Sequence, residues 1–224
     1  MSYIIGKKEK LMSKEVVLKD DFLSRDTSGG LGWTALAGSG GGVAISTSLL
    51  DTQHPGIITT RCAAGSSSAW ASLSLSPCFL LSGKQTYIEA LVYCSHARVF
   101  GVEDIRLIFG FGNSTSLTFV EGVYFVGSTT WLARTEKNNI LTQTDTHIAI
   151  AKETWYKLGI LIALDYTKAE FFINDVLVAT INTNLPDAEV MPLLGMNRVL
   201  VSGVETIKFC CDYVYLKYLF ELER

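Results

Sequence analysis

Residues 155–162 read Trp-Tyr-Lys-Leu-Gly-Ile-Leu-Ile, and residues 168–180 read Lys-Ala-Glu-Phe-Phe-Ile-Asn-Asp-Val-Leu-Val-Ala-Thr. The first segment is nearly unbroken in its apolar character and has the length of a buried strand. In the second segment, Asn174 and Asp175 separate two short apolar runs. Such a pair is a turn signal, because both residue types tolerate left-handed backbone conformations. The two segments therefore predict a buried strand followed by a β-hairpin.

The rest of the chain after residue 20 has the same texture, with apolar segments separated by clusters of Gly, Ser, Asn and Asp. In residues 70–75, Trp and Ser alternate with Ala and Leu, and this period of two indicates a half-buried strand. Many short strands without a long amphipathic helix predict an all-β sandwich or barrel. The predicted strands cover residues 43–49, 56–61, 70–75, 87–94, 105–111, 117–126, 131–135, 147–150, 156–164, 169–173, 176–181 and 206–220.

The chain has 224 residues, of which 48% are hydrophobic, and this is enough apolar material for one sizeable core. All-β sandwiches of this length are routinely single domains, so we expect one domain over residues 21–224. Residues 1–20 differ from it in composition, which predicts an N-terminal arm or linker; a solvated tail is the alternative. If it is an arm, we expect it to bind a partner through its lysines Lys7, Lys8, Lys10 and Lys14.

Charge and composition exclude several classes of protein. The formal net charge is −3, which gives no electrostatic argument for nucleic acid binding. No apolar run approaches the roughly 18 residues of a membrane span. Apolar residues precede the first lysines, the reverse of a signal peptide, so we expect synthesis and folding in a cytoplasm. The five cysteines are odd in number and irregularly spaced, and we expect buried or surface thiols rather than disulfides.

The hairpin segment carries a resemblance to the concanavalin A-like lectin/glucanase family, and especially to its laminin-G-like branch. In that family a Trp-Tyr strand precedes a hairpin whose first strand ends in Phe-x-Ile-Asn-Gly; here Asp175 stands in place of the Gly. The closing strand 207–216, with Asp212-Tyr213-Val214, is also similar to the family pattern. The resemblance implies an all-β, concanavalin A-like antiparallel β-sandwich (jelly roll) preceded by the N-terminal arm.

The first half of the chain has a narrower resemblance. Asp21-Phe22, Gly30-Leu-Gly-Trp33 and His54-Pro-Gly56 look like segments of phage virion proteins that carry this sandwich. The resemblance implies a non-enzymatic virion structural protein: a capsid decoration protein, head fibre or tail accessory protein. Its partners would be capsid or tail proteins, and we expect a homo-oligomer located in the virion.

Catalytic and metal sites have weak support in the sequence. A retaining glycosidase needs two carboxylates about 5–5.5 Å apart, and the Glu-x-Asp-x-x-Glu strand of glycosidases with this fold is absent. Glu103-Asp104 would point to opposite faces of a strand, and Glu221 and Glu223 lie at the end of the chain. Cys94 and His96 lack a third ligand nearby. We therefore expect no enzyme activity, no metal and no cofactor.

A lectin-like module that recognises host glycan is the alternative function. Trp131 lies between polar loops and near Arg134, and an exposed Trp beside a polar loop is a common way to stack a sugar ring. Asn138 and Asn139 could supply hydrogen bonds at the edge of such a ring. These four residues are the candidate glycan site, although a buried core or subunit-interface Trp131 is an open alternative.

Overall fold

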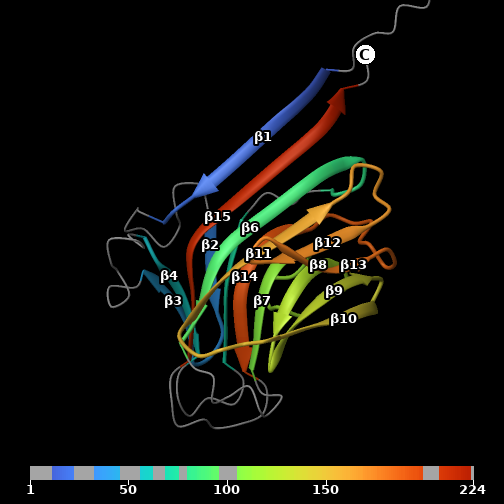
Figure 1. Ribbon diagram of the computed structural model, residues 1–224. Coiled ribbons are helices and arrows are strands. Elements are labelled where there is room, and N and C mark those ends of the chain that lie inside the picture. Colours follow the sequence, from blue (N-terminus) through green and yellow to red (C-terminus); the bar gives the residue numbers. More distant parts are fainter. Residues whose placement is uncertain are drawn as a thin grey trace, which may run out of the picture.

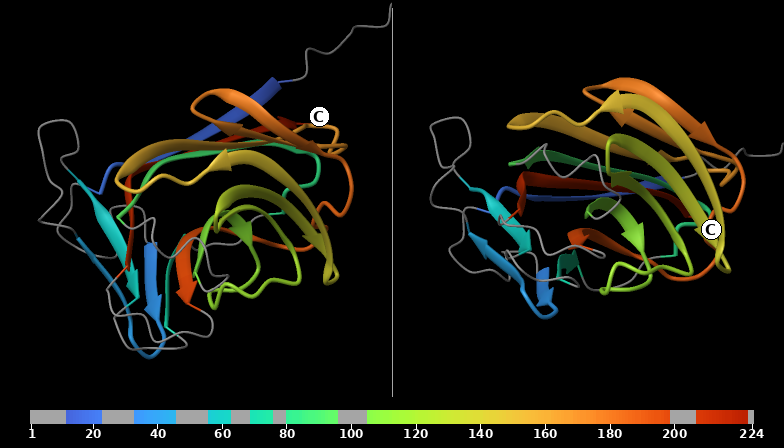
Figure 2. Two further views of the ribbon diagram at one scale, coloured as in Figure 1. Left: turned by 60° about the horizontal axis from the view of Figure 1, so that its bottom comes forward. Right: turned by 90° about the horizontal axis from the view of Figure 1, so that it is seen from below.

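The computed structural model describes residues 12–22, 33–45, 56–62, 69–75, 80–95, 105–198 and 207–222. These residues form fifteen β-strands in two antiparallel sheets, and they contain no helix. Figure 2 shows the two curved sheets as layers of a sandwich. None of the described residues forms a helix that is long and apolar enough to span a membrane. The predicted antiparallel β-sandwich is confirmed.

Sheet A has eight strands, and sheet B has seven (Figure 1). The order in sheet A is β13 (Val176–Ile181), β12 (Ala169–Ile173), β11 (Thr154–Ile162), β6 (Lys84–Cys94), β15 (Ile207–Leu222), β4 (Ile58–Cys62) and β3 (Gly41–Ile45), with β1 (Met12–Asp20) also paired to β15. The order in sheet B is β10 (Ile140–Ala149), β9 (Thr130–Lys137), β8 (Gly122–Gly127), β7 (Ile105–Gly112), β14 (Met191–Arg198), β5 (Trp70–Leu75) and β2 (Trp33–Ala37).

The core lies between the sheets because alternate side chains of each strand point inward. In β6, for example, the side chains of Ile88, Ala90 and Val92 are buried, and the residues between them are half-buried on the opposite face. Aromatic rings join the two layers: the rings of Phe125 in β8 and Phe171 in β12 meet edge to face, with centroids 5.2 Å apart. Aromatic pairs of this kind stabilise the sandwich beyond the burial of their area.

The predicted hairpin is present as β12 and β13. Asn174 and Asp175 have φ angles of 51° and 65°, so both central residues adopt the left-handed conformation that a type I′ turn requires. The Asn174 N–H donates to the Lys157 carbonyl oxygen at 2.8 Å, and the Lys157 N–H donates to Asn174 Oδ1 at 2.9 Å. The turn therefore also closes onto β11.

The interpretation of the N-terminal residues as an arm needs a correction for residues 12–20. They form β1, which pairs with the second half of β15 from Met12 opposite Leu222 to Asp20 opposite Val214 (Figure 1). The buried Asp20 carboxylate accepts hydrogen bonds from the Phe22 N–H at 2.9 Å and from Trp33 Nε1 at 3.1 Å. These contacts fix the end of β1 to the body of the sandwich.

The cysteines that the structure describes are free and buried: Cys62, Cys94, Cys210 and Cys211. Burial raises the pKa of Cys62 and of Cys210 to about 11, so both are protonated thiols at neutral pH. Buried neutral thiols behave as small apolar side chains. This agrees with the prediction of thiols; Cys78 lies outside the described residues.

Candidate functional site

The outer face of sheet A is unusually rich in aromatic side chains. An antiparallel sheet with one solvated face normally shows polar residues there. Here most of the outward residues of four neighbouring strands are half-buried against one another, and many are Tyr, Trp, Phe or Leu. We call this surface the tyrosine face; it consists of Gln85, Tyr87, Glu89, Leu91, Tyr93, Trp155, Lys157, Leu161, Glu170, Phe172, Tyr213, Tyr215, Lys217 and Leu219.

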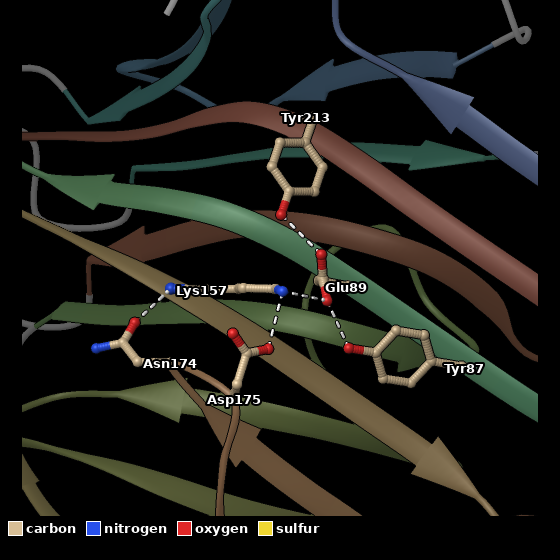
Figure 3. Close-up of polar contacts among 6 residues, drawn as sticks. All are labelled: Tyr87, Glu89, Lys157, Asn174, Asp175 and Tyr213. Carbon is tan, nitrogen blue, oxygen red and sulfur yellow. Dashed lines mark hydrogen bonds and ion pairs between the residues drawn. The ribbon is translucent and has the colours of Figure 1, made fainter. Parts of the chain in front are cut away.

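A polar network centred on Glu89 orders part of this face (Figure 3). The Tyr87 hydroxyl donates to Glu89 Oε2 at 2.5 Å, and the Tyr213 hydroxyl donates to Oε1 at 2.7 Å. Lys157 Nζ lies 3.2 Å from Glu89 Oε2 and 2.8 Å from Asp175 Oδ1. One carboxylate therefore holds two tyrosines and a lysine that come from three different strands.

The protonation states in this network support its hydrogen bonds. The bond to Asp175, and then that to Glu89, raises the pKa of Lys157, which keeps the ammonium charged. Burial, followed by the bond to Glu89, raises the pKa of Tyr87 and of Tyr213, so both hydroxyls remain donors. At neutral pH the two phenols and the ammonium therefore keep the protons that bind the carboxylate.

Ring contacts extend the order over the rest of the tyrosine face. The Tyr93 and Trp155 rings have centroids 5.1 Å apart, and the Tyr87 and Tyr215 rings meet edge to face at 6.2 Å. Beside the second pair lies a shallow hollow of about 300 Å³. It is lined by Gln85, Tyr87, Leu161, Tyr215, Lys217 and Leu219. The face thus combines ordered aromatic rings with a concave spot.

The outer face of sheet B differs, because the chain itself covers part of it. Leu117 and Phe119, in the segment that precedes β8, pack on Ile108, Tyr124 and Leu193 in a second apolar cluster. The Ser72 hydroxyl in β5 donates to the Thr115 carbonyl oxygen at 2.7 Å and fastens this segment to the sheet. Among the described residues, no comparable segment covers the tyrosine face.

The prediction that Trp131 stacks a sugar ring is wrong. Its side chain is 0% exposed and belongs to the core between the sheets, which was the open alternative. Arg134, three residues further along β9, points to the opposite face, where its Nε donates to Gln143 Oε1 at 2.7 Å. Residues three apart in a strand lie on opposite faces, so these two side chains cannot contact one ligand.

The other two glycan candidates, Asn138 and Asn139, form the turn between β9 and β10, with φ angles of 52° and 63°. Asn138 lines an open pocket of about 450 Å³, which we call the amide pocket. Its lining consists of Lys137, Asn138, Ile140, Tyr166, Asn182, Asn184 and Leu185. Asn139 is exposed and is not among the lining residues.

The walls of the amide pocket are held together by the buried carboxylate of Glu121. Its Oε1 accepts from the Asn138 N–H at 2.9 Å, and its Oε2 accepts from the Asp187 N–H at 3.2 Å. Lys137 Nζ bridges to Asp187 Oδ2 at 2.7 Å. On the third side, the hydroxyl of the half-buried Tyr166 donates to the Pro186 carbonyl oxygen. The pocket is therefore built on fixed loops.

The remaining predicted site residues are only partly described. Lys14 lies in β1, whereas Lys7, Lys8 and Lys10 lie outside the described residues, as do His96, Glu103, Asp104 and Glu223. Across the described parts of the chain, no three His, Cys, Asp or Glu side chains lie close enough to hold a metal ion.

Sequence reasoning missed Tyr87, Glu89 and Tyr213 as site residues. A signal was available within one strand, because Tyr87, Glu89 and Tyr93 alternate with apolar residues and must share a face. Their contact with Tyr213 and Lys157 depends on the pairing of β6 with β15 and β11, which alternation alone does not give.

Comparisons with known proteins identify the fold but no family. No protein-family model matches the sequence, and no curated protein matches it. Among solved structures, a protein of unknown function, SO2946 from Shewanella oneidensis MR-1, is similar with a TM-score of 0.68 and 10% identity, over 96% of this chain and 91% of that one.

Two further structures have a stated class. The Emp47p carbohydrate recognition domain is similar with a TM-score of 0.59 and 12% identity, over 89% of this chain and 93% of that one. The endo-1,3-beta-glucanase from Streptomyces sioyaensis is similar with a TM-score of 0.58 and 9% identity, over 98% and 100%. At such low identity the likeness shows the fold alone. The fold of this chain is thus the concanavalin A-like β-sandwich of lectin and glucanase domains.

Proposed function

We propose that this chain is a non-enzymatic structural protein that acts through protein–protein contacts made by its tyrosine face. The observation that carries the proposal is the band of half-buried aromatic and aliphatic side chains on the outer face of sheet A, which the described chain leaves uncovered. Tyr and Trp are enriched in protein interfaces because they bury a large area with few rotatable bonds.

The Glu89 network suits this role. A binding surface loses affinity when its side chains must be ordered on contact, at about 0.5–1.5 kcal/mol for each mobile side chain. Tyr87, Tyr213 and Lys157 are already held by the Glu89 carboxylate before any partner arrives. The network therefore presents preorganised rings, with the polar groups between them already paired.

We further propose that the partner is a phage-type virion, where the chain serves as a capsid decoration, head-fibre or tail accessory protein. Support for this part comes from the first-half segments Asp21-Phe22, Gly30-Leu-Gly-Trp33 and His54-Pro-Gly56. Non-covalent attachment through the tyrosine face would cement or display the domain on the particle, and such proteins act in many symmetric copies.

The test is incorporation into particles induced from the strain that encodes the chain. We expect Leu161→Glu, on the tyrosine face, to lower the copy number per particle at least tenfold, because an unpaired carboxylate in an interface costs about 2–5 kcal/mol. Leu36→Glu, the same change at an exposed position of β2, is the matched control and should be incorporated normally. Quantitative mass spectrometry of purified particles measures both.

Two results would contradict the proposal separately. Absence of the wild-type chain from purified particles would rule out the virion role. Equal incorporation of both variants would show that the tyrosine face makes no contact, even if the chain is a virion protein.

A second candidate function, glycan binding, is favoured by the amide pocket. Side-chain amides both donate and accept hydrogen bonds, which matches the hydroxyl groups of a saccharide, and three of them line this pocket. Ile140 and Leu185 add apolar surface for the C–H faces of a sugar ring. Small-ligand sites commonly combine such features on fixed walls.

An array of immobilised glycans tests this candidate with two variants of one turn. Asn138→Gly removes a lining amide and keeps the left-handed backbone, so we expect binding at least tenfold weaker. Asn139→Gly is the matched control, because Asn139 has the same conformation and does not line the pocket. If the wild-type protein binds no glycan, or both variants bind as it does, the amide pocket is not a saccharide site.

A further inference from the structure

The β1 strand leaves a regular sheet edge open. One edge of its nine residues pairs with β15, and its other edge pairs with no strand of the described chain. Val16 and Val17 are each 44% exposed, and as consecutive strand residues they lie on opposite faces. An open edge with exposed apolar residues on both faces is a template for pairing with another strand.

The charges on β1 are arranged for pairing with a second copy of the same strand. Glu15, Val17 and Lys19 alternate along the face that continues the tyrosine face. Glu15 Oε2 lies 3.0 Å from Lys217 Nζ, and Lys19 Nζ lies 5.8 Å from the centre of the Tyr213 ring. A negative and a positive residue therefore stand at equal distances along the strand on either side of Val17.

We infer that two copies of the chain associate by antiparallel pairing of their β1 edges about a two-fold axis through Val17. In this register Val17 lies opposite Val17 of the second copy, and Val16 lies opposite Leu18 of the second copy. Glu15 lies opposite Lys19 of the second copy, and symmetry makes this ion pair twice. Directly opposite charges of unlike sign stabilise an antiparallel pair.

Neighbouring registers are less favourable, which makes the inference specific. Because opposite residues must share a face, the register can shift only by two residues, to centre on Val16 or on Leu18. The first shift places Glu15 opposite Val17 of the second copy, and the second places Lys19 opposite Val17. Both shifts lose the two Glu15–Lys19 ion pairs, so the register centred on Val17 is favoured over both.

The dimer has a geometric consequence for the tyrosine face. Opposite residues in an antiparallel sheet point to the same side, so joining two β1 edges makes sheet A continuous across both copies. The two tyrosine faces then lie on the same side of the joined sheet. A dimer of this kind could contact a surface at two places at once and gain avidity. The pairing itself is independent of the proposed function.

Charge reversal with rescue tests the ion pairs. All variants carry Lys217→Gln, which removes the partner of Glu15 within the same chain. We expect Glu15→Lys alone and Lys19→Glu alone to weaken dimerisation at least tenfold in sedimentation velocity, and the double variant Glu15→Lys/Lys19→Glu to restore it. A monomeric wild-type chain at all concentrations would overturn the inference, as would a double variant no better than the single ones.

Cross-linking tests the register. With Cys78 changed to Ser, Val17→Cys should form a covalent dimer under mild oxidation, because opposite Cα atoms about 4.5–5.5 Å apart suit a disulfide. Val16→Cys is the matched control. Because Val16 lies opposite Leu18 of the second copy, the Cα atoms of the two substituted residues are farther apart than the roughly 7 Å that a disulfide can span. Equal cross-linking of the two variants, or none, measured by non-reducing electrophoresis, would refute this register.

Discussion

Replacing Trp131 with Ala is expected to lower the free energy of unfolding by about 3–5 kcal/mol, the usual range for a fully buried large aromatic side chain. Its ring lies against Phe125 of its own sheet, at 6.2 Å between centroids, and against Tyr156 and Phe209 of sheet A, at 5.7 Å and 6.5 Å. Removing it leaves a cavity that both sheets line, and neither sheet can close that cavity without moving.

Urea denaturation followed by circular dichroism measures this effect, and Trp131→Phe serves as the control. The Trp131 indole N–H has no hydrogen-bond partner among the described residues, so Phe loses ring area without leaving a partner unpaired. We expect the Phe variant to lose clearly less stability than the Ala variant. A loss below about 1 kcal/mol for Trp131→Ala would mean that the side chain is exposed after all, since surface substitutions have small effects.

Replacing Gly110 with Ala is expected to cost about 2–6 kcal/mol, the sum of backbone strain and overpacking. Gly110 lies in β7 opposite Tyr124 of β8, and its φ of 144° is one that side-chain-bearing residues rarely adopt. A Cβ atom there would lie 2.4 Å from the Val123 carbonyl oxygen and 2.7 Å from the Tyr124 Cα. Both atoms belong to the backbone of a central strand and cannot move aside.

Gly83 separates the two contributions, because it also has a positive φ, of 70°, but a Cβ atom there would meet nothing within 4 Å. Gly83→Ala should therefore cost about 1 kcal/mol, from backbone strain alone. Chemical denaturation of both variants gives the comparison. Equal losses for the two variants would show that close packing of β7 on β8 contributes nothing at Gly110.

The sequence predicted a strand most directly where the inward positions are apolar and the outward positions include polar residues. In residues 87–94 the inward positions are all apolar and the outward positions are Tyr87, Glu89, Leu91 and Tyr93; these residues form most of β6. The strand β14 was missed for the opposite reason: its Leu193, Leu194 and Met196 are buried on both faces, so no alternation appears. Proline normally disfavours a central strand, but Pro192 lies opposite Phe111 of β7, outside the segment of β14 that pairs with β5.

Edge strands, and segments that cover the outer face of a sheet, were also difficult to predict from the sequence. The predicted strands omit residues 142–145, but these residues belong to β10, an edge strand in which exposed side chains alternate with half-buried ones. All four side chains are polar, so this alternation of exposure leaves no trace in the sequence. Residues 117–126 read as one strand, whereas β8 begins at Gly122, and Leu117 and Phe119 instead cover the outer face of sheet B. Apolar content reports burial, but it does not distinguish a strand from a loop that packs on one.

For the candidate sites, the sequence indicates which side chains of one strand share a face. It does not indicate which side chains of different strands come into contact. Trp131 and Arg134 are three residues apart in a predicted strand, so their separation onto opposite faces could have been foreseen. The amide pocket could not have been foreseen. Asn138 and Asn182 line it together only because of the path that the chain takes between β13 and β14. The type I′ turn at Asn174 was predicted correctly because its signal is entirely local.

The position of β15 in sheet A also has a consequence for how the chain folds during synthesis. This strand lies between β6 on one side and β4 and β1 on the other, yet it comes from residues 207–222. Synthesis proceeds at about 5–20 residues per second. Until residues 207–222 have left the ribosome, no strand is present that can join β1 and β4 to β6. A nascent chain that lacks residues 207–222 thus carries an incomplete sheet with unpaired edges. We expect sheet A to be completed only after these residues emerge, in a step that is slowed by contacts between distant residues and helped by chaperones that shield those edges.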